Sequence, residues 1–133
     1  MTTLAWISAI AIAAAPLTNS PWPAPRHGTT YVVAQGGAHA DLPEGSLAAC
    51  KKAIELGVDF LGVDLKQVDG KILAVTDKGE ATKDAAPLEE LLDAAHGKCG
   101  VLLNLHDVPA DKAAEIVKKH DMSKTALFQA SPD

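Results

Sequence analysis

From residue 31 onward, the chain alternates short apolar runs with longer segments in which apolar residues recur at helical spacing. Runs such as VLLNL, in which apolar residues do not alternate strictly with polar ones, are typical of strands buried on both faces of a parallel sheet. The pattern predicts five strands, at residues 31–34, 60–65, 72–75, 101–105 and 125–129. Because these strands alternate with helical segments, the pattern indicates an α/β fold built on a parallel sheet.

Two of the helical segments have clear starts and stops. Ser46 is a favourable N-cap for a helix over residues 47–56, and Gly57 is suited to end it. Pro87 suits the first position of a second helix, which stops at Gly97. Both helices fall between predicted strands, as a βαβ arrangement requires.

A third helix begins at Pro109 or Asp111. Its spacing is expected to direct three apolar residues towards the core: Ala114, Ile116 and Val117. The second and third strands are linked by the turn signal Asp69-Gly70. That link is too short for the helix of a parallel crossover, so this unit is expected to be irregular.

Five strands and three helices amount to about half of an eight-stranded barrel, which takes ~250 residues. The expected fold is therefore α/β, a partial or distorted TIM-type (β/α) barrel. An open half of this kind leaves unpaired sheet edges.

Composition modifies this picture mainly at the N-terminus. The 133 residues are 47% hydrophobic, which indicates a globular chain, and the formal charge of -5 argues against nucleic acid and anionic lipid as partners. The apolar run at residues 4–15 is too short for a membrane span of ~20 residues but suits the core of a signal peptide. We therefore expect a signal peptide or another N-terminal extension at 1–24, a linker at 25–30 and one domain at 31–133. A signal peptide would make the protein secreted or periplasmic.

The chain has two cysteines, Cys50 on a predicted helix and Cys99 at the start of a predicted strand. In an exported protein they could form a disulfide, but the sequence does not give their separation. Two buried thiols that pack as small apolar residues are the favoured alternative.

Six short motifs follow one another along residues 32–128. They are QGG at 35–37, PEGSL at 43–47, GVD at 62–64, the turn at 69–70 with the strand end Thr76-Asp77, PLEELL at 87–92, and NLH at 104–106. In this order and spacing they resemble the glycerophosphodiester phosphodiesterase family. The family counterparts are His-Arg-Gly, Pro-Glu-Asn-(Ser/Thr)-Leu, Glu-x-Asp, Asp-Gly with a strand ending in His-Asp, Pro-x-Leu-Glu-Glu, and acidic-x-Lys. The resemblance implies the TIM barrel of the phospholipase C-like phosphodiesterases, of which this chain covers about half.

The family resemblance also implies a metal-dependent phosphoric diester hydrolase of lipid or glycerophosphodiester metabolism. Such an enzyme needs two histidines for acid–base work and carboxylates that bind Mg²⁺ or Ca²⁺. Most of those positions are substituted here: Gln35 and Thr76 replace the histidines, Gly36 the arginine, Gly62 and Asn104 two acids, Gly45 an asparagine, and His106 a lysine. No catalytic residue of the family is intact, because neither glutamine nor threonine transfers protons near neutral pH.

The metal ligands that remain by resemblance are Glu44 and Asp64, and Asp77 and His106 are candidate polar residues of the rim. Two carboxylates bind Mg²⁺ or Ca²⁺ weakly, because these cations prefer more oxygen ligands. The amides around Gly36 could cradle an oxyanion, although a loosened loop is the favoured alternative.

Three hypotheses follow for function. The leading one is a catalytically impaired or inactive phosphodiesterase domain that binds a glycerophosphodiester or a small phosphoester. Whether it is an enzyme at all stays open at this point. The alternative is a binding or assembly module whose barrel is completed by a second copy or a partner chain. The third is an active variant that uses His106, Asp64 and Glu44 in a new arrangement.

Overall fold

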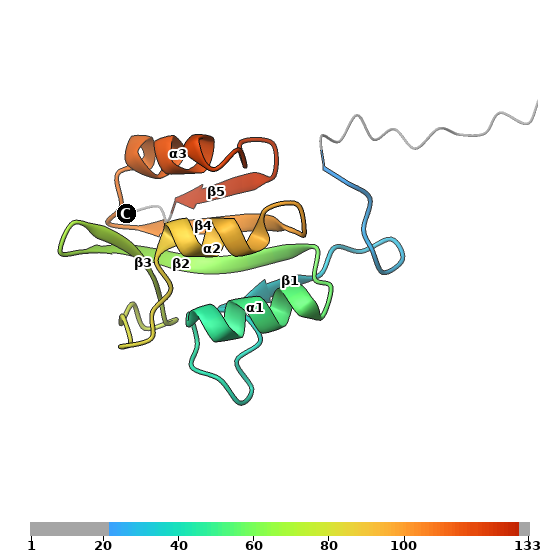
Figure 1. Ribbon diagram of the computed structural model, residues 1–133, viewed down its shortest axis with the longest axis horizontal. Coiled ribbons are helices and arrows are strands. Elements are labelled where there is room, and N and C mark those ends of the chain that lie inside the picture. Colours follow the sequence, from blue (N-terminus) through green and yellow to red (C-terminus); the bar gives the residue numbers. More distant parts are fainter. Residues whose placement is uncertain (1–21, 131–133) are drawn as a thin grey trace, which may run out of the picture.

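The structure is a computed structural model that describes residues 22–130 (Figure 1). The elements follow in the order β1 (Val33–Gln35), α1 (Leu47–Glu55), β2 (Phe60–Val68), β3 (Lys71–Val75), α2 (Leu88–Ala95), β4 (Gly100–His106), α3 (Ala110–Lys119) and β5 (Ala126–Ala130). The apolar run on which the signal-peptide prediction depends lies outside the described residues. Within the described range, no helix combines the length and apolar character that a membrane crossing requires.

The sheet has the strand order β1-β2-β4-β5, and these four strands are parallel. β3 is antiparallel to β2 and pairs with its second half, beyond the residues that pair with β1. Asp69 and Gly70 join β2 to β3, and both have positive φ angles of 50° and 79°. A two-residue turn of this kind matches the right-handed twist of the strands, so the predicted turn is confirmed.

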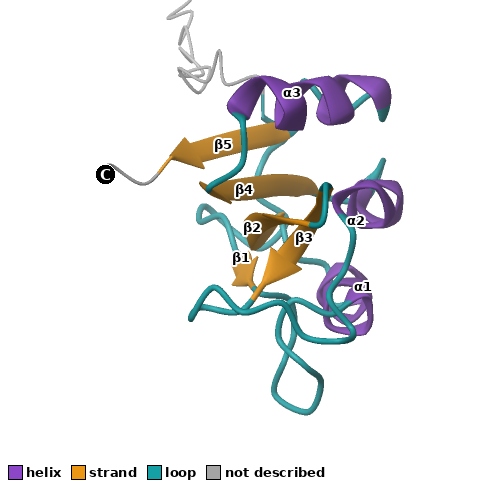
Figure 2. Cartoon of the chain, turned by 90° about the vertical axis from the view of Figure 1, so that its left-hand side faces the viewer, coloured by secondary structure: helices purple, strands orange, loops and turns teal. Residues whose placement is uncertain are grey.

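All three helices pack against one face of the curved sheet (Figure 2). Ser46 caps α1 as predicted, with its Oγ accepting a hydrogen bond from the Ala49 N–H at 3.2 Å. Apolar side chains of β2, β4 and the helices form the core on this side, including Leu61, Val63, Leu65, Leu88, Leu91, Val101 and Leu103. The helix-covered face is thus a regular α/β core.

Several details differ from the sequence prediction, among them the start of β1 and the buried residues of α3. β1 begins at Val33 rather than at residue 31. The Val32 N–H donates to the Asp59 side chain instead of to a backbone carbonyl of β2, and the Val32 carbonyl accepts from the N–H groups of Asp59 and Phe60. In α3, Ala113 and Val117 are the buried residues, and Ala114 is exposed. The prediction for Ala114 was wrong, because Ala113, and not Ala114, is the residue of this turn of α3 that packs into the core.

The segment before β1 is fixed to the base of the sheet. The Asp59 carboxylate accepts hydrogen bonds from the N–H groups of Arg26 and Val32, at 2.9 and 2.8 Å. The rings of Trp22 and Tyr31 both pack edge-on against Phe60, with centroids 5.6 Å away. These contacts close the end of the sheet at which the parallel strands begin.

The sheet does not close into a barrel. Within residues 22–130, β1 pairs only with β2 and β5 only with β4. The fold is therefore a partial TIM-type barrel, as the element count predicted, with one face covered by helices and the other open.

Candidate functional site

The open face carries polar side chains where the parallel strands end. Gly62 and Asp64 alternate on β2 with residues buried against the helices, so they point to the other side. Strand register places Gln35 of β1 beside Gly62, and Asn104 of β4 beside Asp64. We refer to Gln35, Asp64, Asn104 and His106 as the strand-tip cluster.

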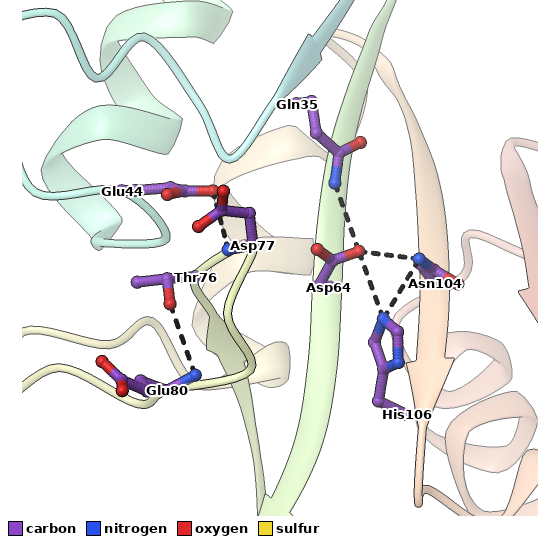
Figure 3. Close-up of polar contacts among 8 residues, drawn as sticks. All are labelled: Gln35, Glu44, Asp64, Thr76, Asp77, Glu80, Asn104 and His106. Atoms are coloured by element: carbon purple, nitrogen blue, oxygen red, sulfur yellow. Dashed lines mark hydrogen bonds and ion pairs between the residues drawn. The ribbon is translucent and has the colours of Figure 1, made fainter. Parts of the chain in front are cut away.

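Asp64 is the centre of this cluster (Figure 3). Its Oδ1 accepts hydrogen bonds from Asn104 Nδ2 at 2.8 Å and from Gln35 Nε2 at 3.3 Å, and His106 Nε2 lies 3.6 Å away. The Asp64 side chain is only 15% exposed. A carboxylate this enclosed needs hydrogen-bond donors, and two neutral amides supply them.

Asn104 links the other members of the cluster. Besides its bond to Asp64, its Nδ2 lies 3.2 Å from His106 Nε2, which can accept an N–H when that nitrogen carries no proton. The Asn104 Oδ1 is buried and has no hydrogen-bond partner among the described residues. Asn104 therefore acts here as a donor to its neighbours.

The strand-tip cluster does not fit a divalent cation. Metal ligands direct lone pairs at the ion, whereas Gln35 and Asn104 direct N–H groups at Asp64 Oδ1. A Cβ at Gly62 would collide with Gln35 Oε1, so the glutamine fills the space that a side chain at position 62 would need. Within residues 22–130, no group of three or more His, Cys, Asp and Glu side chains is arranged to hold a metal ion.

Glu44, the other predicted ligand, belongs to a separate set of contacts. Its Oε1 accepts a hydrogen bond from the Asp77 N–H at 3.1 Å, and its Cγ lies 2.6 Å from where a Cβ on Gly36 would be. In the described part of the chain, no hydrogen bond or ion pair joins Glu44 to Asp64. Thr76 uses its Oγ1 to accept the Glu80 N–H at 3.3 Å, within the loop after β3. Neither Glu44 nor Thr76 therefore joins the strand-tip cluster.

The glycine loop after β1 is held by its own backbone. The Gly36 N–H donates to the Gly62 carbonyl at 2.7 Å, and the Ala38 N–H donates to the Ala49 carbonyl at 2.9 Å. Gly37 lies so close to α1 that a Cβ would be 2.6 Å from the Ala49 carbonyl carbon. Two amides of the hypothetical oxyanion cradle are thus engaged in holding the loop to β2 and α1.

A cavity of about 250 Å³ lies beside the strand-tip cluster. It is lined by Lys66, Asp77, Lys78, Gly79, His106 and Asp107. The cavity brings together Asp77 and His106, the two predicted rim residues. Sequence reasoning missed its two lysines, although Lys66 could have been found by continuing the alternation of β2 two residues beyond Asp64.

The two cysteines are free thiols. Burial, and secondarily the neighbouring Cys99, raises the pKa of the Cys50 thiol to about 11. Burial also raises the pKa of Cys99. Thiols with raised pKa are poor nucleophiles, so neither cysteine is a catalytic candidate.

Comparison with known proteins supports the fold. No protein-family model and no curated protein matches this chain. Among solved structures, a glycerophosphodiester phosphodiesterase from Agrobacterium tumefaciens is similar, with a TM-score of 0.68, 19% identity, and coverage of 78% of this chain and 59% of that one. A glycerophosphodiester phosphodiesterase from Parabacteroides distasonis gives a TM-score of 0.62 and 18% identity, covering 75% and 56%.

A third similar structure is the glycerophosphoryl diester phosphodiesterase domain of a Mycobacterium tuberculosis protein. It gives a TM-score of 0.61 and 15% identity, covering 77% of this chain and 53% of that one. The chain thus spans between about half and three-fifths of the length of these solved proteins. Together with the open sheet, these matches show that the chain has the glycerophosphodiester phosphodiesterase fold, in the form of a partial TIM barrel.

Proposed function

We propose that this domain binds small phosphoesters at its strand tips and does not hydrolyse them by the metal-dependent route that its fold suggests. The observation that carries the proposal is the environment of Asp64, whose Oδ1 receives N–H groups from Gln35 and Asn104. These two N–H donors stabilise the negative charge on Oδ1 without a cation. The phosphoester class comes from the names of the proteins that share the fold.

The chemistry of phosphodiester cleavage supports the negative half of the proposal. The transition state carries charge on oxygen, which a metal ion or fixed cations must stabilise, and the leaving alkoxide needs a proton donor. Loss of a single stabilising contact of this kind costs about 10²–10³ in rate. Here Gln35, Gly62 and Asn104 alter several contacts together, so hydrolysis is expected to fall below detection.

Steady-state turnover of glycerophosphocholine tests the proposal. The purified chain is assayed with Mg²⁺, with Ca²⁺ and with EDTA, and Asp64→Ala serves as the matched control. We expect no metal-dependent release of glycerol 3-phosphate from either protein. Turnover that requires the metal and disappears in Asp64→Ala would refute the proposal, as would failure of the chain to bind any phosphoester.

A second candidate function is assembly with a complementary half-barrel. It is favoured by the exposed apolar residues on the two outermost strands, where Val33, Leu127 and Phe128 are 44%, 39% and 43% exposed. An exposed strand edge with apolar side chains is a template for pairing with another chain. Sedimentation analysis should then detect a dimer or a heteromer, and a monomer that stays folded at high concentration would contradict assembly.

A further inference from the structure

Lys66 is a partly buried residue at the edge of the cavity beside the strand-tip cluster. It lies on the open face of β2, in register with His106 on β4. In the described part of the chain, no hydrogen bond or ion pair involves its ammonium group. A lysine can bury its aliphatic stem while its ammonium group stays accessible, so the positive charge at the edge of the cavity favours a ligand of opposite charge.

The surroundings of Lys66 indicate what such a ligand is like. Lys78 and His106 line the same cavity, and they can place further N–H donors on an anion. Asp77 and Asp107 also line it, and their carboxylates favour hydroxyl or amine groups. The cavity therefore offers cationic and anionic groups side by side.

We propose that Lys66 is the anion-binding residue of this domain, and that the cavity takes a small phosphate ester whose hydroxyl or amine groups face Asp77 and Asp107. The inference rests on the proposed function, which supplies the phosphoester class. Lysine binds phosphate as a point charge and needs no metal ion. By family resemblance, position 106 would carry the lysine. In this chain, Lys66 lies on the neighbouring strand, in register with residue 106.

Calorimetric titration of the full chain in EDTA tests the inference, with glycerol 3-phosphate and inorganic phosphate as probes. Lys66→Gln removes the charge, Lys66→Arg keeps it, and Lys119→Gln on the exposed face of α3 is the control with the same change in net charge. Lys66→Gln is expected to weaken glycerol 3-phosphate binding about tenfold or more, because it removes a charged hydrogen bond. Lys66→Arg and the control should stay within about threefold of wild type.

The ester is also expected to bind more tightly than inorganic phosphate, because only the ester has alcohol hydroxyl groups, on its glycerol moiety, that can reach the carboxylates while its phosphate contacts Lys66. Asp107→Asn should reduce that advantage. Amide chemical-shift mapping on the wild-type protein provides a measurement that needs no variant to fold. The perturbed residues should lie at the ends of β2 and β4 and in the loop after β3.

The possible outcomes distinguish failure of the role of Lys66 from failure of the proposed function. Equal binding by wild type and Lys66→Gln, or shifts centred on the groove lined by Arg26, Lys51 and Lys98, would overturn the role of Lys66 and leave the proposed function standing. Absence of any binding to the wild-type chain, or metal-dependent turnover, would overturn the proposed function itself.

Discussion

The side chains on the two faces of β4 differ in burial and in polarity. On the helix side, Val101, Leu103 and Leu105 are buried against α2 and α3 in a regular apolar core. On the open side, Leu102, Asn104 and His106 are only partly buried, and two of them take part in the strand-tip cluster. The comparison shows that the fold depends on a repeated apolar pattern, whereas the chemistry of the site depends on single side chains that can be exchanged without loss of the fold.

The largest expected effect is on the helix side. Leu103→Ala should lower the free energy of unfolding by ~2–5 kcal/mol, because it leaves a cavity in a fully buried core. Its matched control is Leu102→Ala, the same change one residue earlier on the open face, which should cost less than half as much. Chemical denaturation measures both. Equal costs would contradict the contrast between the faces, and a Leu102→Ala cost that grows with protein concentration would favour assembly.

Asp59→Asn, at the base of the sheet, should have the next largest effect on stability. Hydrogen bonds from the N–H groups of Val32 and then Arg26 hold the pKa of the Asp59 carboxyl below its ordinary value. Its stabilising contribution is therefore fully present above the pKa of an unfolded aspartate, about 3.9, and is lost as the pH falls through the lower folded value.

Thermal melts from pH 7 down to pH 2 measure this contribution. At neutral pH, Asp59→Asn should melt below wild type, and the difference should shrink as the pH falls. A difference that stays constant down to pH 2 would show that the carboxylate charge is not what fixes residues 26–32.

Gly62→Ala should have a smaller effect that is specific to the strand-tip cluster. The added Cβ would displace the Gln35 amide and lie 3.2 Å from Val33 Cγ1. We expect a loss of about 1 kcal/mol, since one hydrogen bond to Asp64 is weakened and a flexible side chain can move. The side-chain amide signals of Gln35 should shift by NMR while the helix-side methyl signals stay in place. Movement of those methyl signals would mean that the two faces are not independent.

The smallest expected effect belongs to the contact between α2 and α3. His120 Nδ1 lies 2.8 Å from Asp93 Oδ1, but the carboxylate is exposed. His120→Asn should therefore change the free energy of unfolding by less than about 1 kcal/mol. A larger loss in chemical denaturation would indicate that this pair fixes α3 on the sheet.

The sequence was informative about the scaffold because scaffold signals extend over many residues. Ser46, Gly57 and the Asp69-Gly70 turn gave correct element boundaries, since each has a local backbone role. The strand-tip cluster could be predicted only in part. The family resemblance drew attention to positions 35, 62, 64, 104 and 106, but the filling of the Gly62 space by Gln35 depends on strand register.

Lys66 was missed for a different reason. The predicted strand stopped at residue 65, whereas β2 continues to Val68 and carries Lys66 to the level of His106. Strand ends are set by pairing with β3 and β4, and single-strand patterns do not contain that information.

Titration with Mn²⁺, followed by electron paramagnetic resonance, tests the central claim most directly. Mn²⁺ takes the same oxygen ligands as Mg²⁺, and a cluster in which amides satisfy Asp64 should give no stoichiometric site below millimolar concentration. We predict identical titrations for wild type and Asp64→Ala. A one-to-one site of micromolar affinity that Asp64→Ala removes would contradict the account.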